Sequence, residues 1–352
     1  MTNIKIGDFE IKKGRAMLIA ELSANHGGSF DIALKTLEAA KEAGADAVKL
    51  QTYTADTLTI KCSRPEFTLS NGSIWDGSTY YDLYSSAYTP WHWQPKLKEA
   101  ADKMGLILFS SPFDFTAVDF LEKMDVPAYK IASFEIVDIP LIKYTASKGK
   151  PIIISTGIAE DKDVKKAVDA CHAVGNHQII LLKCTSSYPA PLNEANLNAI
   201  PYLEKTFGVP SGLSDHTEGN IAAVASVVLG GVIIEKHFIL DKSISSADAS
   251  FSVTPQEFKN MVEAVRMAES ALGENCLTLT ASQKRGRAFS RSLYAVEAIK
   301  KGEAFTEKNI RSIRPCGGLH PEYYEKILGK KAVKDIERGE PLKLSMFEDE
   351  NI

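Results

Sequence analysis

The chain has 352 residues, of which 44% are hydrophobic and 24% are charged, a composition that excludes disordered, fibrous and disulfide-dominated proteins. Its formal net charge is −4 at pH 7, so no overall basic field predicts binding to nucleic acid or to an anionic membrane surface. The most apolar stretch, residues 221–234, is too short to span a bilayer. Residues 1–15 have no apolar segment of a secretion signal. The five cysteines are scattered and form no C-x-x-C pair. We therefore expect a cytoplasmic protein.

Short apolar runs alternate with amphipathic segments from residue 17 to about residue 271. The apolar runs predict eight strands, at residues 17–22, 47–51, 106–110, 128–132, 151–155, 178–183, 210–214 and 232–236. The amphipathic segments predict helices, for example at residues 31–43, 94–104, 161–174, 218–229 and 255–272. Eight alternations predict an α/β protein with a (β/α)8 barrel. An open doubly wound sheet is the alternative, but no G-x-G-x-x-G turn is present.

Two regions depart from this alternation. The connection at residues 52–90 is far longer than usual and rich in aromatic residues, so we predict a substrate wall or lid rather than an insertion without a role. After residue 272 the pattern changes. We predict a barrel domain over residues 1–272, a linker over 273–284 and a small domain over 285–352, whose marginal core would pack on the barrel or on another subunit.

Polar residues close every predicted strand, where barrel enzymes carry their chemistry. Lys49, Lys130 and Lys183 would meet there with many hydroxyl groups, a combination that suits a phosphate and a carboxylate. Salt bridging within the barrel is the alternative role for each lysine. The other candidates at these ends are Glu21, Gln51, Ser133, Glu135, Ser155, Thr185, Ser186, Tyr188, Ser214 and Asp215.

Two histidines end adjacent predicted strands. His216 and His237 are placed to bind one divalent cation and to leave positions open for water and substrate. No cysteine ligand accompanies them, so zinc is not indicated. Glu21 is an acidic group in a cationic pocket, and we expect it to relay protons. Glu135 has mixed expected roles, including neutralisation of the lysines.

The strand-end motifs together resemble the bacterial sialic acid synthases. The resemblance rests on AELSANH (20–26), KLQ (49–51), YKIAS (129–133), STG (155–157), CT (184–185), YP (188–189), LSDH (213–216) and EKHF (235–238). Residues 313–315 (IRP) and 318–319 (GL) are similar to the antifreeze-like, or SAF, domain of that family. The resemblance implies a TIM barrel followed by an SAF domain. It also implies a transferase that condenses phosphoenolpyruvate with an open-chain amino sugar.

Family resemblance also implies roles for individual residues. A divalent metal, Mn²⁺ or alternatively Mg²⁺ or Co²⁺, would be bound by His216 and His237, and Glu21 and Glu135 would complete the catalytic set. Phosphoenolpyruvate would be bound by Lys49, Lys130, Ser133, Ser155, Thr185, Ser186 and Ser214. The sugar would be contacted by Gln51, Tyr188, Asp215 and Arg314. In this family the last of these comes from the partner subunit of a domain-swapped homodimer.

Three features resemble the pseudaminate branch of this family, whose sugar is 2,4-diacetamido-2,4,6-trideoxy-L-altrose. They are Lys183 and Ser186 around the CT pair, the run at residues 243–252, and the IWD (74–76) and LY (83–84) pairs of the long connection. An N-acetylneuraminate or legionaminate synthase is the alternative within the family. Outside it, the alternatives are a Schiff-base aldolase using Lys130 or Lys183, and a non-enzymatic carbohydrate-binding protein.

Overall fold

The computed structural model describes residues 3–70, 72, 74–274 and 276–347. Of the predicted domain ranges, residues 1, 2, 71, 73, 275 and 348–352 lie outside this description. The chain divides into two compact units, Met1–Gly273 and Glu274–Ile352.

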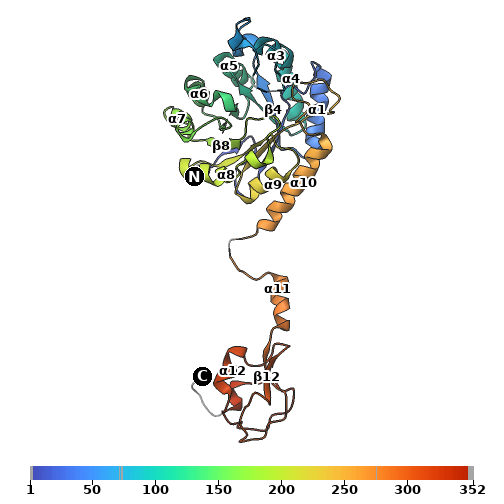
Figure 1. Cartoon of the computed structure of the whole chain (residues 1–352), viewed down its shortest axis with the longest axis vertical. Helices are drawn as coiled ribbons and strands as arrows, with labels where there is room; N and C mark the ends of the chain where they lie inside the picture. The colour runs from blue at the N-terminus through green and yellow to red at the C-terminus, as the bar shows by residue number, and fades with distance from the viewer. Residues whose placement is uncertain (1–2, 71, 73, 275, 348–352) are drawn as a thin grey trace. The chain divides into compact units, whose positions relative to one another are not determined.

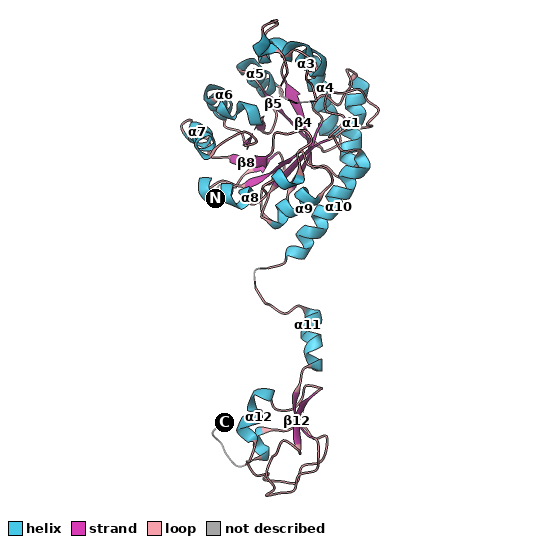
Figure 2. Ribbon diagram, viewed as in Figure 1, coloured by secondary structure: helices cyan, strands magenta, loops and turns pink. Residues whose placement is uncertain are grey.

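The first unit is a closed parallel barrel of eight strands surrounded by helices, which confirms the predicted fold (Figures 1 and 2). Its strands are β3 (Met17–Glu21), β4 (Ala47–Thr52), β5 (Ile107–Pro112), β6 (Tyr129–Ile131), β7 (Ile152–Ser155), β8 (Ile179–Cys184), β9 (Ser211–Asp215) and β10 (Ile233–His237). Strand β10 pairs with β3 and closes the ring. The register sets Glu21 beside His237 and beside Lys49, so these three residues meet at one end of the barrel.

Eight helices of the described chain surround the barrel, and several of them begin at side-chain caps. They are α1 (Phe30–Glu42), α4 (Gln94–Lys103), α5 (Phe115–Lys123), α6 (Ile139–Ala146), α7 (Asp161–His172), α8 (Ala199–Phe207), α9 (Ile221–Val228) and α10 (Pro255–Leu272). Ser29 caps α1 and Asp114 caps α5. Thr254 and Glu257 form a capping box at the start of α10, which satisfies backbone N–H groups that the first helical turn leaves unpaired.

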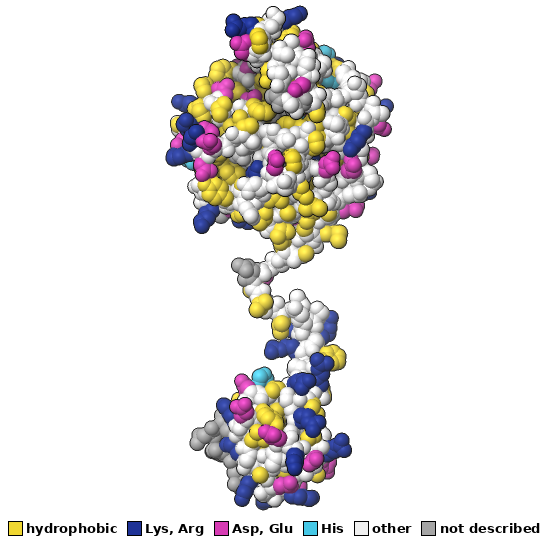
Figure 3. All heavy atoms as spheres, viewed as in Figure 1, with side chains coloured by type: hydrophobic (Ala, Val, Ile, Leu, Met, Phe, Trp, Pro, Cys, Tyr) yellow, Lys and Arg dark blue, Asp and Glu magenta, His cyan; other side chains and the backbone are white. Residues whose placement is uncertain are grey.

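Apolar side chains are visible on the surface of the barrel where α9 and α10 run (Figure 3). Ile221 and Val228 of α9 are 64% and 57% exposed, and Met267 of α10 is 71% exposed. A helix of this composition is ordinarily covered on most sides. This face is therefore apolar beyond what its own barrel buries.

A short hairpin precedes the barrel and was not predicted. Strands β1 (Lys5–Ile6) and β2 (Phe9–Glu10) pair antiparallel. Ile4 and Ile6 belong to the same apolar cluster as Met17 and Phe109 of the barrel interior. Met17 is the first residue of β3, so this cluster lies at the amino ends of the strands. The hairpin therefore packs across the end of the barrel opposite to the carboxyl ends.

The long connection between β4 and α4 is ordered around two short helices, α2 (Ala55–Leu58) and α3 (Tyr80–Ala87). The indole Nε1 of Trp75 donates a hydrogen bond of 3.1 Å to the carbonyl oxygen of Ala247. This contact ties the connection to the segment that follows β10, at the carboxyl end of the barrel.

The second unit is small and has its own apolar core. Strands β11 (Ser292–Ala295) and β12 (Ile310–Ile313) pair antiparallel, and the helices are α11 (Ala281–Gly286) and α12 (Tyr324–Ile327). Helix α11 begins inside the stretch predicted as a linker. The core of the second unit includes Leu293, Phe305 and Ile310. In the described part of the chain, no helix is long and apolar enough to cross a membrane.

Candidate active site

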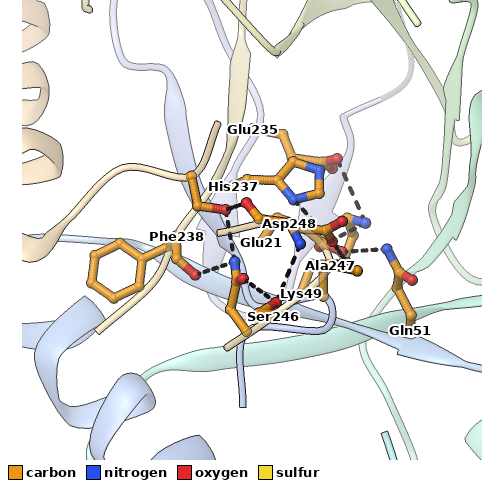
Figure 4. Close-up of polar contacts among 12 residues, drawn as sticks. Glu21, Lys49, Gln51, Glu235, His237, Phe238, Ser246, Ala247 and Asp248 are labelled. Atoms are coloured by element: carbon orange, nitrogen blue, oxygen red, sulfur yellow. Dashed lines mark hydrogen bonds and ion pairs between the residues drawn. The ribbon is translucent and has the colours of Figure 1, made fainter. Parts of the chain in front are cut away.

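A buried cluster of charged side chains occupies the carboxyl end of the barrel (Figure 4). The Nζ of Lys49 lies 2.7 Å from Glu21 Oε2 and 3.5 Å from Glu235 Oε1. The Nζ of Lys130 is also 3.5 Å from Glu235 Oε1. Gln51 Nε2 donates to Glu21 Oε1 at 2.9 Å. The cluster thus has two lysines, and each of them faces a carboxylate.

Burial and pairing act in opposite directions on these groups. Burial raises the pKa of the Glu21 carboxyl, although Lys49 opposes this shift. For Glu235 burial also acts to raise the pKa, but Lys130 and Lys49 outweigh it and the pKa is lowered. Burial lowers the pKa of Lys130. Glu235 is therefore the ionised partner of the lysines, and Glu21 is the carboxyl group suited to exchange a proton.

Serine hydroxyl groups lie at the carboxyl ends of the neighbouring strands β7 and β8. Ser155 Oγ and Ser186 Oγ are buried and have no hydrogen-bond partner among the described residues. Ser133 Oγ accepts a hydrogen bond of 3.2 Å from the backbone N–H of Gly157. Buried polar atoms are ordinarily paired. Two buried hydroxyls without a partner among the described residues are therefore available to bind the oxygens of an anion.

His216 and His237 lie side by side, with ring centroids 5.3 Å apart. His216 Nδ1 lies 3.0 Å from the carbonyl oxygen of Thr185, which requires a proton on Nδ1 and leaves Nε2 free as a ligand. Burial lowers the pKa of His237 well below its ordinary value, so its imidazole is neutral. Its Nδ1 has no hydrogen-bond partner among the described residues.

The donor set of the histidine pair fits a divalent cation. No group of three or more His, Cys, Asp or Glu side chains in the described part of the chain is arranged to hold a metal ion. Two histidine ligands would instead leave several positions for water or substrate, which is what Lewis-acid catalysis requires. The residues present therefore fit a partly exposed cation rather than a closed structural site.

A cavity of about 460 Å³ opens above the charged cluster. Its polar lining includes Gln51, Glu135, Tyr188, His237 and Asp248. Burial raises the pKa of the Glu135 carboxyl to about 7. The ring of Tyr188 packs on His216 with the centroids 4.3 Å apart. The cavity therefore joins His237 to Glu135, a second carboxyl group with a pKa of about 7.

Most of the barrel residues predicted for the site come together here, but the polar groups of Asp215 and Thr185 are engaged by other protein groups. Both carboxylate oxygens of Asp215 are occupied, one by Lys236 Nζ at 2.6 Å and the other by Thr217, and Asp215 does not line the cavity. Thr185 Oγ1 donates to the carbonyl oxygen of Glu194 at 3.2 Å, so its hydroxyl is engaged. Arg314 belongs to the second unit.

Two residues of the site were missed by the sequence analysis. Glu235 accepts a hydrogen bond of 3.3 Å from Ser214 Oγ in addition to its lysine contacts. It stands two residues before His237 on the same strand, so the two-residue period of a strand could have placed it in the lumen. Asp248 accepts a 2.5 Å hydrogen bond from Ser23 Oγ. It lies in an irregular segment, where no periodic signal exists.

The fold and site together define a TIM-barrel enzyme that acts on an anionic substrate at the carboxyl ends of its strands. The chain belongs to the NeuB family, which matches residues 36–276, and an SAF domain matches residues 290–348. The predicted family and the SAF domain are thereby confirmed.

The relatives are similar over nearly the whole chain. Pseudaminic acid synthase of Campylobacter jejuni subsp. jejuni serotype O:23/36 is 49% identical over 98% of this chain and 100% of its own. Pseudaminic acid synthase of Helicobacter pylori is 46% identical over 92% of this chain and 96% of its own. Among solved structures, spore coat polysaccharide biosynthesis protein SpsE of Bacillus subtilis is 34% identical, with a TM-score of 0.66. The match covers 99% of this chain and 100% of the SpsE chain. N-acetylneuraminic acid synthetase of Leptospira borgpetersenii is 29% identical, with a TM-score of 0.72. The match covers 81% of this chain and 95% of the synthetase chain.

Proposed function

We propose that the protein condenses phosphoenolpyruvate with 2,4-diacetamido-2,4,6-trideoxy-L-altrose to give pseudaminic acid and phosphate. The observation that carries the proposal is the buried cluster of Lys49 and Lys130, together with the hydroxyls of Ser155 and Ser186 that lack partners among the described residues at the same end of the barrel. The choice of sugar is supported by relatives named pseudaminic acid synthases, at 46% to 49% identity. An N,N'-diacetyllegionaminic acid synthase is 35% identical.

Phosphoenolpyruvate carries a phosphate and a carboxylate, and the cluster has donors for both. Lys49 and Lys130 supply positive charge at 3% and 2% exposure, where the low dielectric strengthens their attraction for an anion. The hydroxyls supply directed hydrogen bonds. The full proposed set is Lys49, Lys130, Ser133, Ser155, Ser186 and Ser214. The hydroxyl of Thr185 is engaged by Glu194, so we leave Thr185 out of the set.

Condensation joins carbon 3 of phosphoenolpyruvate to the aldehyde carbon of the open sugar. The aldehyde oxygen takes up a proton, and water adds at carbon 2 with loss of a proton. The bond between carbon 2 and the phosphate oxygen then breaks, phosphate leaves, and carbon 2 becomes a ketone. A divalent cation held by His216 and His237 would supply Lewis-acid polarisation of the aldehyde when bound.

Two carboxyl groups are placed to move these protons. Glu21 is held by Lys49 and Gln51 within the cluster, and we assign it to the proton of the attacking water. Glu135 lines the cavity and has a pKa of about 7, so a large fraction of it is protonated at neutral pH. We assign it to the proton that the aldehyde oxygen receives.

The sugar would lie in the cavity against Gln51 and Tyr188. We propose that Arg314 of the partner subunit completes this site in a domain-swapped homodimer, as the family resemblance implies. The exposed apolar faces of α9 and α10 support an assembly of this kind. We also propose a cytoplasmic location, supported by five cysteines that are all free thiols.

The test is phosphate release from phosphoenolpyruvate with Mn²⁺ and each of two sugars, the 6-deoxy diacetamido L-altrose and N-acetylmannosamine. Release with the first sugar alone supports the proposal. Release with N-acetylmannosamine alone moves the protein to the N-acetylneuraminate branch. Phosphoenolpyruvate labelled with ¹⁸O at its bridging position should deliver the label to phosphate, because the bond to carbon 2 is the one that breaks.

Reduction with borohydride distinguishes the proposed condensation from the mechanism of a Schiff-base aldolase. A Schiff-base aldolase using Lys130 or Lys183 would be trapped as a covalent adduct with its substrate. The same enzyme would keep its activity after chelation. We expect no adduct and full loss of activity on chelation, with recovery on addition of Mn²⁺.

A further inference from the structure

The cavity has two chemically different sides. Its base is polar, as described above. The connection between β4 and α4 contributes the apolar side chains that we name the apolar wall: Leu58, Leu69, Trp75, Leu83 and Ala87. The same connection also lines the cavity with the rings of Tyr53, Tyr80 and Tyr84. The side chains of the apolar wall carry no charge, and the one polar atom among them, the indole N–H, donates to Ala247. The mechanism proposed above uses none of them.

The apolar wall is held in place by its own hydrogen bonds. Thr54 and Thr57 form a capping box at the start of α2, and Thr79 Oγ1 caps α3 by accepting from the N–H of Asp82 at 3.1 Å. Tyr53 and Tyr84 line the cavity with the wall, and their rings pack edge to face with the centroids 5.7 Å apart. A wall fixed in this way presents a preformed apolar surface rather than a loop that adapts to each ligand.

We infer that the apolar wall binds the methyl groups of the sugar and selects a sugar with a methyl at carbon 6 over one with a hydroxymethyl. This inference rests on the proposed function and names what determines its substrate. An added hydroxyl at the wall would give up hydrogen bonds to water and find no partner among the five wall side chains. Apolar pockets reject an added hydroxyl by up to about 100-fold.

The experiment compares kcat/KM for two sugars that differ only at carbon 6. They are 2,4-diacetamido-2,4,6-trideoxy-L-altrose and its 6-hydroxy counterpart, 2,4-diacetamido-2,4-dideoxy-L-altrose. Leu58→Asn and Leu83→Asn each replace an apolar side chain by a polar one of similar size. We expect either variant to reduce the preference for the 6-deoxy sugar by about 10-fold, with KM for phosphoenolpyruvate unchanged.

Ile60→Asn is the matched control. Ile60 belongs to the same connection, is 59% exposed and does not line the cavity, so its replacement should leave the preference as it is. A loss of preference in this variant equal to that in the leucine variants would overturn the inference.

Wild-type protein supplies a measurement that does not depend on variant folding. If it uses the two sugars equally well, the inference is wrong whatever the variants do. If the variants are folded and keep the wild-type preference, the inference is also wrong. Activity with neither sugar, but with N-acetylmannosamine, contradicts the proposed function itself, and the inference fails with it.

Discussion

Gly157 follows the end of strand β7 at a point where the backbone must approach three side chains. A Cβ built there would stand 2.7 Å from Ser133 Oγ and closer still to Ser186 Oγ. Both hydroxyls belong to the proposed phosphoenolpyruvate site. The absence of a side chain at this residue therefore lets the hydroxyls converge.

Replacement of this glycine should damage binding of phosphoenolpyruvate. We expect Gly157→Ala to lower kcat/KM for phosphoenolpyruvate by about 100-fold, because the new methyl group displaces groups that position the substrate. Gly286→Ala is the matched control, since a Cβ at Gly286 meets no atom within 4 Å. Equal activity of the two variants would show that the hydroxyls are not part of the site.

Glu135 should make the stability of the fold depend on pH. Burial raises its pKa from 4.5 to about 7, so between these values the unfolded chain is ionised while the folded chain keeps the proton. The free energy of unfolding therefore falls as pH rises through this window, by at most about 3 kcal/mol. Glu135→Gln should abolish this loss.

Urea unfolding of both proteins between pH 4 and pH 8 tests this expectation. The stability of Glu135→Gln relative to wild type should increase from pH 4.5 to about pH 7 and then stay constant. A difference that is the same at every pH would show that the carboxyl has no raised pKa in the folded protein.

Strands β9 and β10 carry the two histidines at their ends, and a buried ion pair joins these strands. Lys236 Nζ lies 2.6 Å from Asp215 Oδ2, and both residues are 2% exposed. Lys236 also donates to the carbonyl oxygen of Thr217. The pair therefore fixes the ends of two elements rather than contacting substrate.

Removal of one partner of the Lys236–Asp215 pair should destabilise the folded protein. We expect Lys236→Met to lower the free energy of unfolding by about 3–5 kcal/mol, because Asp215 is left buried without its cation. Adding Asp215→Asn to that variant should restore part of the stability. Lys300→Met is the control, because the Lys300–Asp335 pair is 78% and 62% exposed and should contribute less than about 1 kcal/mol. Equal losses would contradict this account.

Elements with a strong apolar pattern were predicted within one or two residues, as the strand ending at Ser155 illustrates. The hairpin of β1 and β2 was missed because two-residue strands have no periodicity. Lysines and histidines of the site were found because they end strands of a barrel. Asp248 was not found because its contact with Ser23 joins segments 225 residues apart, and only the folded chain brings them together.

At the scale of the whole molecule, the second unit has a core of its own and carries Arg314, which the proposed dimer supplies to the other subunit's barrel. This exchange can be tested by complementation. His237→Ala and Arg314→Ala should each be nearly inactive on their own. Co-expressed, they should recover about a quarter of wild-type activity, because half of the randomly assembled dimers would have one intact site. No recovery would place Arg314 in the site of its own barrel.

The hairpin that packs across the lower end of the barrel has a consequence for the order of events during turnover. Because Ile4 and Ile6 fill that end, both substrates enter, and both products leave, through the cavity at the carboxyl ends. Phosphoenolpyruvate would bind at the deeply buried lysines, and the sugar would bind above it. From the proposed site we therefore expect phosphoenolpyruvate to bind before the sugar and the nine-carbon acid to leave before phosphate.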